Sequence, residues 1–474
     1  MIGVIARKEL LELWRDGRFR VVALVLLALL VAAELLGWRN YVDLSRQAQQ
    51  ASHDERERWL SQGNKYPHAA AHYGVFAFKA PRPLSILDSG IQPYVGTSVW
   101  LEAHKQNEML YRPAEDATAL QRFGDLNAAG VGQVLLPLLI IFMAFPAFAG
   151  EREEGTLKQL VLLGLSPYQL LLGKAAGQAA ALSIVLVPAF LLTLTLVGVL
   201  APAGTLADEL IRALGFAVVY AVYFGGFLFF TLAVSARCSS SKAALLIALA
   251  FWALAVLVLP RFLLDSARML YPTQPALELK HALNERLAET AAEKLAASEA
   301  ALLKEYGVTR KEDLPIPFEG LALQSDEEAK YALFEQHYGT FFDAVRRQDF
   351  LFQLGTLIAP TTGLQLLSMA LTGSDIEHHR DFVLQGEANR RVIHTMINEF
   401  MVKHSARNAD GEWEVEAGRE LWERIPPFEY RPPGWRFVLP TYWPSLGLLV
   451  LWAASMLGYA VFAVGRLWTR RADQ

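Results

Sequence analysis

The chain of 474 residues has a single cysteine, Cys238. One thiol cannot form a disulfide within the chain, and it cannot supply the cysteine cluster of a structural zinc site. A phosphate-binding loop is also missing, because Gly173-Lys174 is followed by Ala175 and lacks the preceding glycine at the required spacing. No basic block with interleaved aromatic residues is present, which argues against nucleic acid as a partner. This chain is therefore not expected to bind ATP or nucleic acid itself.

Long apolar runs, by contrast, are abundant. Hydrophobic residues make up 53% of the sequence, and the mean hydropathy is +0.25. The chain is too apolar for an ordinary soluble enzyme and too charged to lie wholly in lipid. Six runs are long enough, at about 1.5 Å of rise per residue, to cross a hydrocarbon core of about 30 Å. The predicted spans are residues 21–37, 131–150, 175–200, 213–234, 243–259 and 442–467.

The predicted spans have almost no charge in their interiors. Glu34, Lys174 and Arg261 lie near span ends, whereas an ion-coupled carrier needs an ionisable residue near the midplane. This argues against a secondary transporter. Basic residues also precede the first run, as in a cleaved signal peptide, but its small-residue cleavage pattern is poor and a membrane anchor fits the topology better.

Basic residues flanking the spans predict the orientation of the chain. With six crossings, the basic flanks all fall on one side, which places both termini, residues 151–174 and Cys238 in the cytoplasm. Residues 1–20 are then a cytoplasmic amphipathic helix at the membrane interface, and residues 468–474 are a cytoplasmic tail. The opposite side receives two long segments, residues 38–130 and 265–440. The flanking basic residues are Arg7, Lys8, Arg15, Arg18, Arg20, Arg237, Lys242, Arg466, Arg470 and Arg471.

The loop between the second and third spans, residues 151–174, has a specific pattern. One side of the expected helix is apolar and the other is charged, as in an amphipathic helix at the membrane surface. The apolar side holds Leu157, Leu160, Val161 and Leu163 to Leu165, and the charged side holds Glu151, Glu153, Glu154 and Lys158. Ser166-Pro167 should end that helix and begin the next. A plain solvated loop would also carry charge, but the order of these residues is more specific than their charge.

The motif Glu-Arg-Glu-x-Gly-Thr-Leu, followed by Pro167 and Gly173-Lys174 at the head of the third span, resembles the permease subunit of ABC-2 type exporters. The amphipathic residues 1–20 add to the resemblance, and the outer region resembles a branch with a large extracytoplasmic domain of unknown function. The resemblance implies that residues 151–174 are the coupling helix. The expected ATPase-coupling residues are Glu151, Arg152, Glu153, Glu154, Gly155, Thr156, Leu157, Leu160 and Val161.

The resemblance further implies a bacterial inner-membrane protein that works as a dimer, with a second permease copy or a related permease. An ABC ATP-binding subunit would bind ATP and Mg, so this chain would hold no cofactor and would not be an enzyme. We expect a mainly α polytopic protein with six transmembrane helices and a mostly helical extracytoplasmic domain built from two loops. Helices are predicted over residues 43–60, 277–306, 325–350 and 389–404.

Histidines are the only candidate metal ligands. His68 and His72 are spaced to share one helix face, and His104 follows downstream. A polar helix is the favoured interpretation, because no Asp or Cys nearby in the sequence completes a ligand set. A second cluster contains His378 next to His379, but adjacent histidines point to different helix faces. The sequence therefore predicts neither a metal nor a catalytic residue.

The function expected from these features is outward, ATP-driven movement of an amphipathic or lipid-linked substrate, with a possible periplasmic partner for the outer domain. Two alternatives stay open. One is a mechanotransmission complex that acts on a periplasmic partner and transports nothing. The other is a metal-handling membrane protein that uses the outer histidines.

Overall fold

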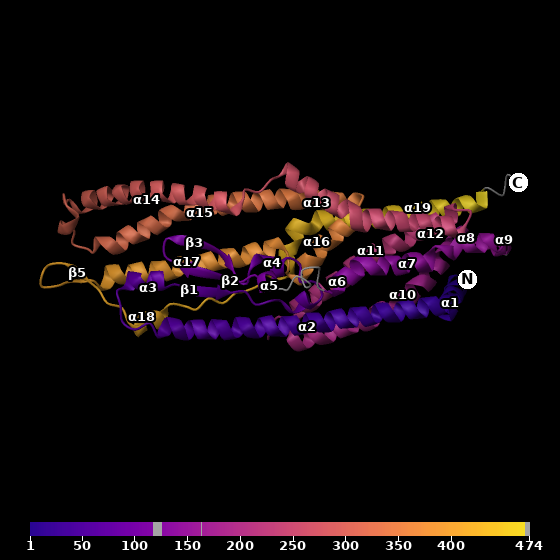
Figure 1. Ribbon diagram of the computed structural model, residues 1–474, viewed down its shortest axis with the longest axis horizontal. Coiled ribbons are helices and arrows are strands. Elements are labelled where there is room, and N and C mark those ends of the chain that lie inside the picture. Colours follow the sequence, from indigo (N-terminus) through magenta and orange to yellow (C-terminus); the bar gives the residue numbers. More distant parts are fainter. Residues whose placement is uncertain (117–125, 163, 470–474) are drawn as a thin grey trace.

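A computed structural model describes residues 1–116, 126–162 and 164–469, so residues 470–474 of the predicted tail lie outside the described part. Figure 1 shows an elongated molecule, with a membrane bundle at the end that carries both termini and a helical domain protruding from the other end. We call these parts the membrane bundle and the protruding domain. The structure is 78% helical, which confirms the predicted fold class.

Within the described residues, six helical segments are long and apolar enough to cross a membrane, as the sequence predicts. They are Gly17–Leu60, Ala128–Glu153, Pro167–Leu200, Leu206–Arg237, Ser241–Leu270 and Trp435–Leu467. Their helices are α2 (Gly17–Leu60), α6 (Ala128–Gly130), α7 (Leu136–Ala144), α8 (Pro146–Glu153), α10 (Pro167–Leu200), α11 (Leu206–Arg237), α12 (Ser241–Trp252), α13 (Leu259–Leu270) and α19 (Leu439–Thr469). Each predicted span lies inside one of these segments.

Two spans contain a π-helical stretch, Val131–Leu135 and Ala253–Val258, and each stretch lies just before a proline. Pro137 has no N–H to donate to the carbonyl of Gln133, so that carbonyl needs another donor within the apolar bundle. The Tyr223 hydroxyl supplies it at 2.9 Å. The indole N–H of Trp252 likewise donates to the carbonyl of Val134 at 3.0 Å. Side chains from neighbouring helices thus satisfy the backbone groups that the irregular turn leaves free.

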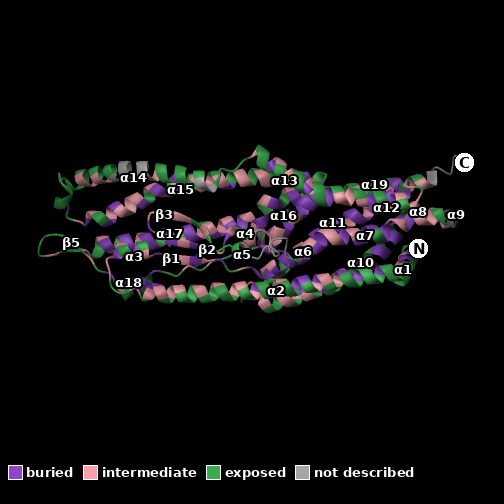
Figure 2. Ribbon diagram, in the orientation of Figure 1, coloured by how far each residue is buried: buried purple, intermediate pink, exposed green. Residues whose placement is uncertain are grey.

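Helix α11 lies inside the bundle. Over the apolar window of its span 56% of the residues are buried, against 28% for the spans of α2, α10, α12 and α19. Its aromatic residues Tyr223 and Phe227 contact Trp452 of α19, with ring centroids 6.4 and 5.5 Å apart. Figure 2 shows the same contrast, with buried residues along α7 and α11 and exposed residues along the outer face of α2. The outer helices therefore present apolar faces to their surroundings.

The protruding domain combines the chain segments before the second span and after the fifth. Its core joins Trp59 at the end of α2 to Trp422, whose ring centroids are 5.6 Å apart, and to apolar residues of both segments. The helices not yet named are α1 (Ile2–Arg15), α3 (Pro67–Tyr73), α4 (Gln92–Val95), α5 (Pro113–Asp116), α9 (Thr156–Leu162), α14 (Ala276–Tyr306), α15 (Phe318–Leu354), α16 (Pro360–Thr372), α17 (Ile376–His404) and α18 (Arg419–Arg424). Short 3-10 helices cover Pro83–Ile86, Lys311–Asp313, Gly355–Leu357 and Trp435–Val438.

Five short strands, which the sequence analysis did not predict, lie in the protruding domain. Strands β1 (Val75–Phe78), β2 (Ser98–Glu102) and β3 (Lys105–Leu110) form an antiparallel sheet in the order β1-β2-β3. The second sheet pairs β4 (Ala406–Arg407) with β5 (Trp413–Glu414). Ala77, Val99 and Leu101 from the larger sheet are buried in the core with Trp59.

An ion network joins the protruding domain to the bundle. Arg82 donates to Asp208 Oδ2 at 2.6 Å and to Glu209 Oε1 at 2.7 Å, both at the start of α11. Arg212, fully buried, donates to Asp208 Oδ2 at 2.9 Å. Both guanidinium groups also donate to the carbonyl of Pro433, at 2.8 and 2.9 Å. The segment before the second span, the start of the fourth span and the segment before the sixth span therefore meet at one charge cluster.

The glycine pair Gly225-Gly226 on α11 allows a test of close packing. A Cβ at Gly226 would lie 2.0 Å from Trp452 Cζ3, whereas a Cβ at Gly225 meets nothing within 4 Å. We expect Gly226→Ala to destabilise the bundle by about 1–3 kcal/mol through overpacking. Gly225→Ala should be neutral or slightly stabilising, because alanine favours helix. Thermal unfolding of the two variants in detergent measures the difference, and equal midpoints would contradict the packing described here.

Candidate docking site at the end of the bundle

The segment after the second span forms two short helices at the end of the bundle where both termini lie (Figure 1). Helix α8 ends at Glu153, and Gly155 then turns the chain with a φ of 77°. This left-handed conformation favours glycine, since a Cβ would clash with the backbone. Helix α9 follows, and Gly164, also with a φ of 77°, leads back toward α10. Ser166 caps α10 through a reciprocal capping box with Gln169, and Pro167 occupies its first turn.

Glu151, the first of the predicted coupling residues, is bound within the chain. Its Oε1 accepts hydrogen bonds from Lys174 Nζ at 2.7 Å and from Lys8 Nζ at 3.1 Å. Lys174 also donates to Glu9 Oε1 at 2.6 Å, and its side chain is 1% exposed. Burial acts to lower the pKa of Lys8, but the charge and hydrogen bond of Glu151 together with the charges of Glu9 and Glu12 outweigh it, and the pKa is raised. This four-residue cluster fastens α1 and α8 to the head of α10.

The next two predicted residues hold the segment to the turn between α11 and α12. Arg152 donates to the carbonyl of Cys238 and, at 2.8 Å, to that of Ala236. Glu153 accepts from the backbone N–H of Ser241 at 3.0 Å and from its hydroxyl at 2.6 Å. Glu151, Arg152 and Glu153 thus attach α8 to four other helices, α1, α10, α11 and α12, which the sequence alone did not indicate.

Helix α9 turns one face to the bundle and one outward. Leu157 is buried in the bundle core, and Leu160 packs against that core. Val161 belongs to α9, but its side chain lies outside the described residues. Leu162 is 83% exposed. Glu153 is itself exposed but bound to Ser241. The other exposed side chains on the outward surface of this segment are Glu154, Lys158, Gln159 and Leu162.

The sequence analysis placed Leu162 on neither face of the helix and did not count it among the coupling residues. Lys158 and Leu162 are four residues apart, so a strict helical period would have placed this leucine on the charged side. Gly155 and Thr156, also among the predicted coupling residues, are half-buried, and Thr156 donates to the carbonyl of Glu151 at 3.2 Å. The outward surface is therefore smaller than the predicted set and differs from it in composition.

The N-terminal helix α1 lies against α10 close to this site. Ile5 and Glu9 face α10 at Gly173 and Gly177, where a Cβ would come within 2.6 Å of α1. Only glycine allows the two helices to approach this closely. The opposite face of α1 exposes apolar residues, as expected for a helix at a membrane interface. These exposed residues are Val4, Leu11 and Trp14.

The candidate metal ligands separate into two places. Among the described residues, His68, His72 and His104 form the one group of three with metal-ligand spacing. Burial lowers the pKa of His68 to about 4, and the imidazoles of His104 and His72 act in the same direction. The carboxylates of Asp326 and Glu327 raise the pKa of His104 to about 9. His378 lies elsewhere, fully buried on α17 with its Nδ1 2.5 Å from Asp375 Oδ1.

Within the described residues, six helical segments long and apolar enough to span a membrane, a short helical segment exposed at one end and a protruding helical domain define a polytopic membrane protein. Comparison with protein families makes this specific. The model of the ABC-2 family transporter protein matches residues 3–314, so the chain belongs to the ABC-2 family of transporters, whose members work with an ATP-binding subunit. A domain of unknown function, DUF3526, matches residues 276–431. No curated protein matches the chain.

The buried Lys174 cluster yields a stability prediction. Lys174→Met leaves Glu9 buried without the ammonium group it contacts, and breaking a buried ion pair in this way costs about 3–5 kcal/mol. Replacing both partners, in Glu9→Leu/Lys174→Met, should recover most of the loss because no charge is then left unpaired at Glu9. Lys158→Met, at an exposed position of α9, is the matched control. Thermal unfolding in detergent compares the unchanged protein with these three variants. If Lys174→Met were as stable as Lys158→Met, the cluster would not be important for stability.

Proposed function

We propose that the chain is the permease subunit of an ATP-driven exporter, and that α8 and α9 form the coupling helix that docks on its ATP-binding subunit. Membership of the ABC-2 family, over residues 3–314, carries this proposal. The position of α9 supports it, because this helix projects from the end of the bundle with Leu162 exposed (Figure 1). ATP and Mg belong to the partner, and this chain supplies the surface on which the partner acts.

The contacts of α8 suggest how movement of the partner reaches the spans. Glu151 is bound to Lys174 on α10, Arg152 to the end of α11, and Glu153 to the start of α12. A push on α9 would therefore be delivered to three spanning helices at once. The docking contact itself would be made by Glu154, Lys158, Gln159 and Leu162. An apolar side chain surrounded by polar ones is a common composition for the centre of such a contact.

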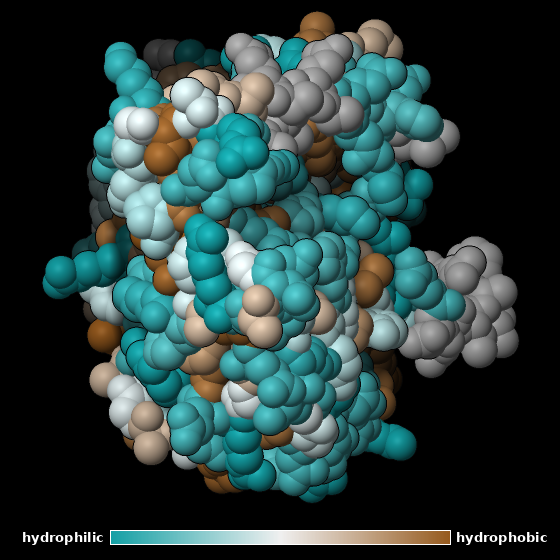
Figure 3. All heavy atoms as spheres, turned by 90° about the vertical axis from the view of Figure 1, so that its left-hand side faces the viewer, coloured by the Kyte–Doolittle hydropathy of each residue, from teal (hydrophilic) through white to brown (hydrophobic). Residues whose placement is uncertain are grey.

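We assign the docking end to the cytoplasm of a bacterium and the protruding domain to the other side of its inner membrane. Both termini lie at the docking end, and the basic residues of the N-terminal tail and of the loop around Arg237 lie there too. Figure 3 views the far end of the protruding domain, whose visible surface is mainly hydrophilic, as suits a domain in water.

The exposed surface of the spans supports our proposal for the substrate class. The outer helices expose apolar residues such as Leu24 on α2, Leu191 on α10 and Leu246 on α12. A surface of this kind suits contact with lipid, with a second permease copy and with an amphipathic or lipid-linked substrate. We therefore assign the exporter to substrates of that class and its working state to a dimer.

One observation favours a second candidate, a mechanotransmission complex acting on a periplasmic partner. Helix α2 runs without interruption for 44 residues, about 66 Å, from the docking end into the core of the protruding domain. A rigid element of this length would carry movement to the domain without any substrate crossing the membrane. Transport by purified complex in vesicles separates the two, because the exporter moves substrate and the mechanotransmission complex does not.

The docking proposal is tested at the outward face of α9. Leu162→Asp places a charge at the centre of the contact, and we expect affinity for the ATP-binding subunit to fall roughly tenfold or more. Glu154→Lys should weaken binding less, since its charge is fully accessible to solvent. Affinity is measured with the two purified subunits, together with transport or stimulated ATP hydrolysis.

The control for these variants is Glu412→Lys, an exposed charge reversal in the protruding domain. It should bind the ATP-binding subunit as the unchanged protein does. All three variants should keep the thermal stability of the unchanged protein, because none of the side chains is buried. Wild-type affinity in the Leu162→Asp protein would overturn the assignment of α9 as the coupling helix.

A further inference from the structure

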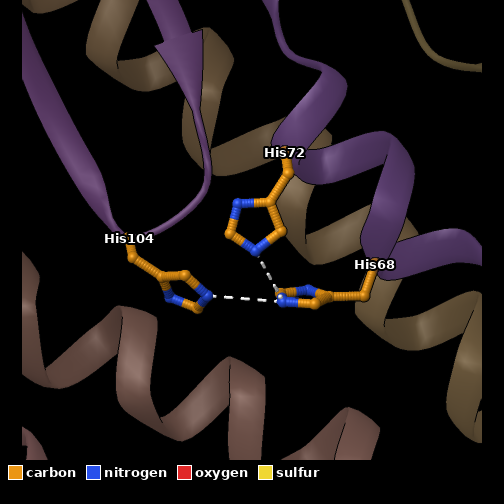
Figure 4. A group of neighbouring side chains, drawn as sticks. All are labelled: His68, His72 and His104. Carbon is orange, nitrogen blue, oxygen red and sulfur yellow. Dashed lines mark hydrogen bonds between the residues drawn. The ribbon is translucent and has the colours of Figure 1, made fainter.

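Three histidine rings meet in the protruding domain, far along the molecule from the docking site. His68 and His72 lie one turn apart on α3, and His104 lies in the tight turn between β2 and β3 (Figure 4). His72 Nε2 is 3.1 Å from His68 Nε2, and His104 Nε2 is 3.4 Å from the same atom. One ring nitrogen from each histidine lies within 4.8 Å of a ring nitrogen of each of the other two. The rings thus direct their outer nitrogens toward one point.

The spacing of these nitrogens matches a tetrahedral metal site. Zinc–nitrogen bonds of about 2.0–2.1 Å at tetrahedral angles place two ligand nitrogens about 3.3 Å apart. The two measured separations, 3.1 and 3.4 Å, lie on either side of that value. Without an ion, His68 Nε2 faces both of the other nitrogens with a single lone pair or a single N–H, so it can make only one full hydrogen bond to them.

Carboxylates from a distant part of the chain orient His104 from behind. Its Nδ1 lies 3.1 Å from Asp326 Oδ2 and 3.1 Å from Glu327 Oε1, both on α15. Glu327 Oε1 also accepts the backbone N–H of His104 at 2.6 Å, and Arg390 holds its other oxygen at 2.7 Å. A carboxylate on the far nitrogen of a histidine is the usual second layer of a zinc site, where it fixes the ring and the tautomer.

The backbone at His104 supports the same conclusion. Its φ is 62°, a left-handed conformation that is uncommon outside glycine. Such a conformation persists where surrounding contacts determine it, and here the Glu327 contact to the backbone N–H holds the turn. The result is that the ring faces α3.

We propose that His68, His72 and His104 bind one divalent transition-metal ion of the Zn²⁺ class through their Nε2 atoms, with a fourth position open to solvent. Three imidazoles without a thiolate select Zn²⁺, Ni²⁺ or Cu²⁺ over Mg²⁺ and Ca²⁺, which prefer oxygen ligands. The exposed side of the site is at His72, so water or a ligand from another molecule can reach the fourth position.

The ion would link parts of the chain that are distant in sequence. It joins α3 to the β2–β3 turn directly, and through Asp326 and Glu327 it fixes both to α15. With its single cysteine the chain has no internal disulfide to do this. The sequence analysis weighed a metal here and favoured a polar helix, because the carboxylates that complete the site follow more than two hundred residues after the histidines.

The test uses the full-length protein in detergent, purified with a tag that contains no histidine and treated with a chelator. Zn²⁺ binding is measured by titration and elemental analysis, and Co²⁺ is added as a spectroscopic probe of tetrahedral coordination. We expect one ion per chain and the absorption bands of tetrahedral Co²⁺. His72→Ala and His104→Ala should each lose the bands and weaken Zn²⁺ binding at least tenfold, while His53→Ala, an exposed histidine on α2, should change neither.

A second-layer variant separates this site from adventitious binding. Asp326→Asn keeps all three ligands but removes one orienting charge, and we expect Zn²⁺ affinity to fall roughly 10-fold to 100-fold. Circular dichroism and gel filtration establish that each variant is folded; His72, whose side chain is exposed, is the position least prone to disturb folding. Zn²⁺ binding that is absent from the unchanged protein, or equal in the His72→Ala, His104→Ala and His53→Ala proteins, would overturn the proposal. Binding of the ATP-binding subunit is not involved in any of these results.

Discussion

A charged side chain inside a membrane bundle must be paired, and this constraint determines how the two ends of the protein are built. At the docking end, Lys174 lies between Glu9 and Glu151, and the cluster binds α1, α8 and α10 together. At the opposite end, Arg82 and Arg212 share Asp208 and the carbonyl of Pro433, and the cluster binds the protruding domain to α11. Between the two clusters the core is made chiefly of aliphatic and aromatic residues. The charges in both clusters thus serve to join segments of the chain.

The same need to pair charged side chains explains why most of the docking segment faces inward. Glu151, Arg152 and Glu153 are placed on α8, where they contact four other helices, and the exposed side chains without such contacts lie beyond them. Anchoring and recognition are therefore carried by different residues of one short segment. A partner that displaced α9 would act on a segment whose first part, α8, is held by hydrogen bonds to charged groups. Such hydrogen bonds are stronger than those between neutral groups.

The sequence predicted the spans well because each is a continuous apolar run, and an apolar run of that length has few other uses. It also predicted the helix start at Ser166-Pro167, since capping is local. The sheet β1-β2-β3 was not predicted because its strands are only four to six residues long and lie in a segment rich in turns. Pairings between distant segments, such as Arg82 with Glu209 or His104 with Glu327, leave no local pattern. For that reason the sequence placed Glu151 and Glu153 outward and gave the histidines little weight.

Helix α2 connects the docking end of the bundle to the core of the protruding domain. It begins beside α1, whose Glu9 is part of the docking-end cluster, passes the segment before the second span at Gly37, and ends in the core of the protruding domain at Trp59. At Gly37 a Cβ would lie 2.1 Å from the carbonyl oxygen of Ile86, so the helix and the chain before the second span are in direct backbone contact. Near its end, Arg56 donates to the carbonyl of Ile425 at 2.9 Å, and Trp59 donates to that of Trp422 at 3.1 Å. The helix contains no proline that would bend it. A bend would also break the contacts at Gly37, Arg56 and Trp59. A shift of α1 against α10 would therefore move α2 as one body, and the protruding domain would respond to events at the docking end.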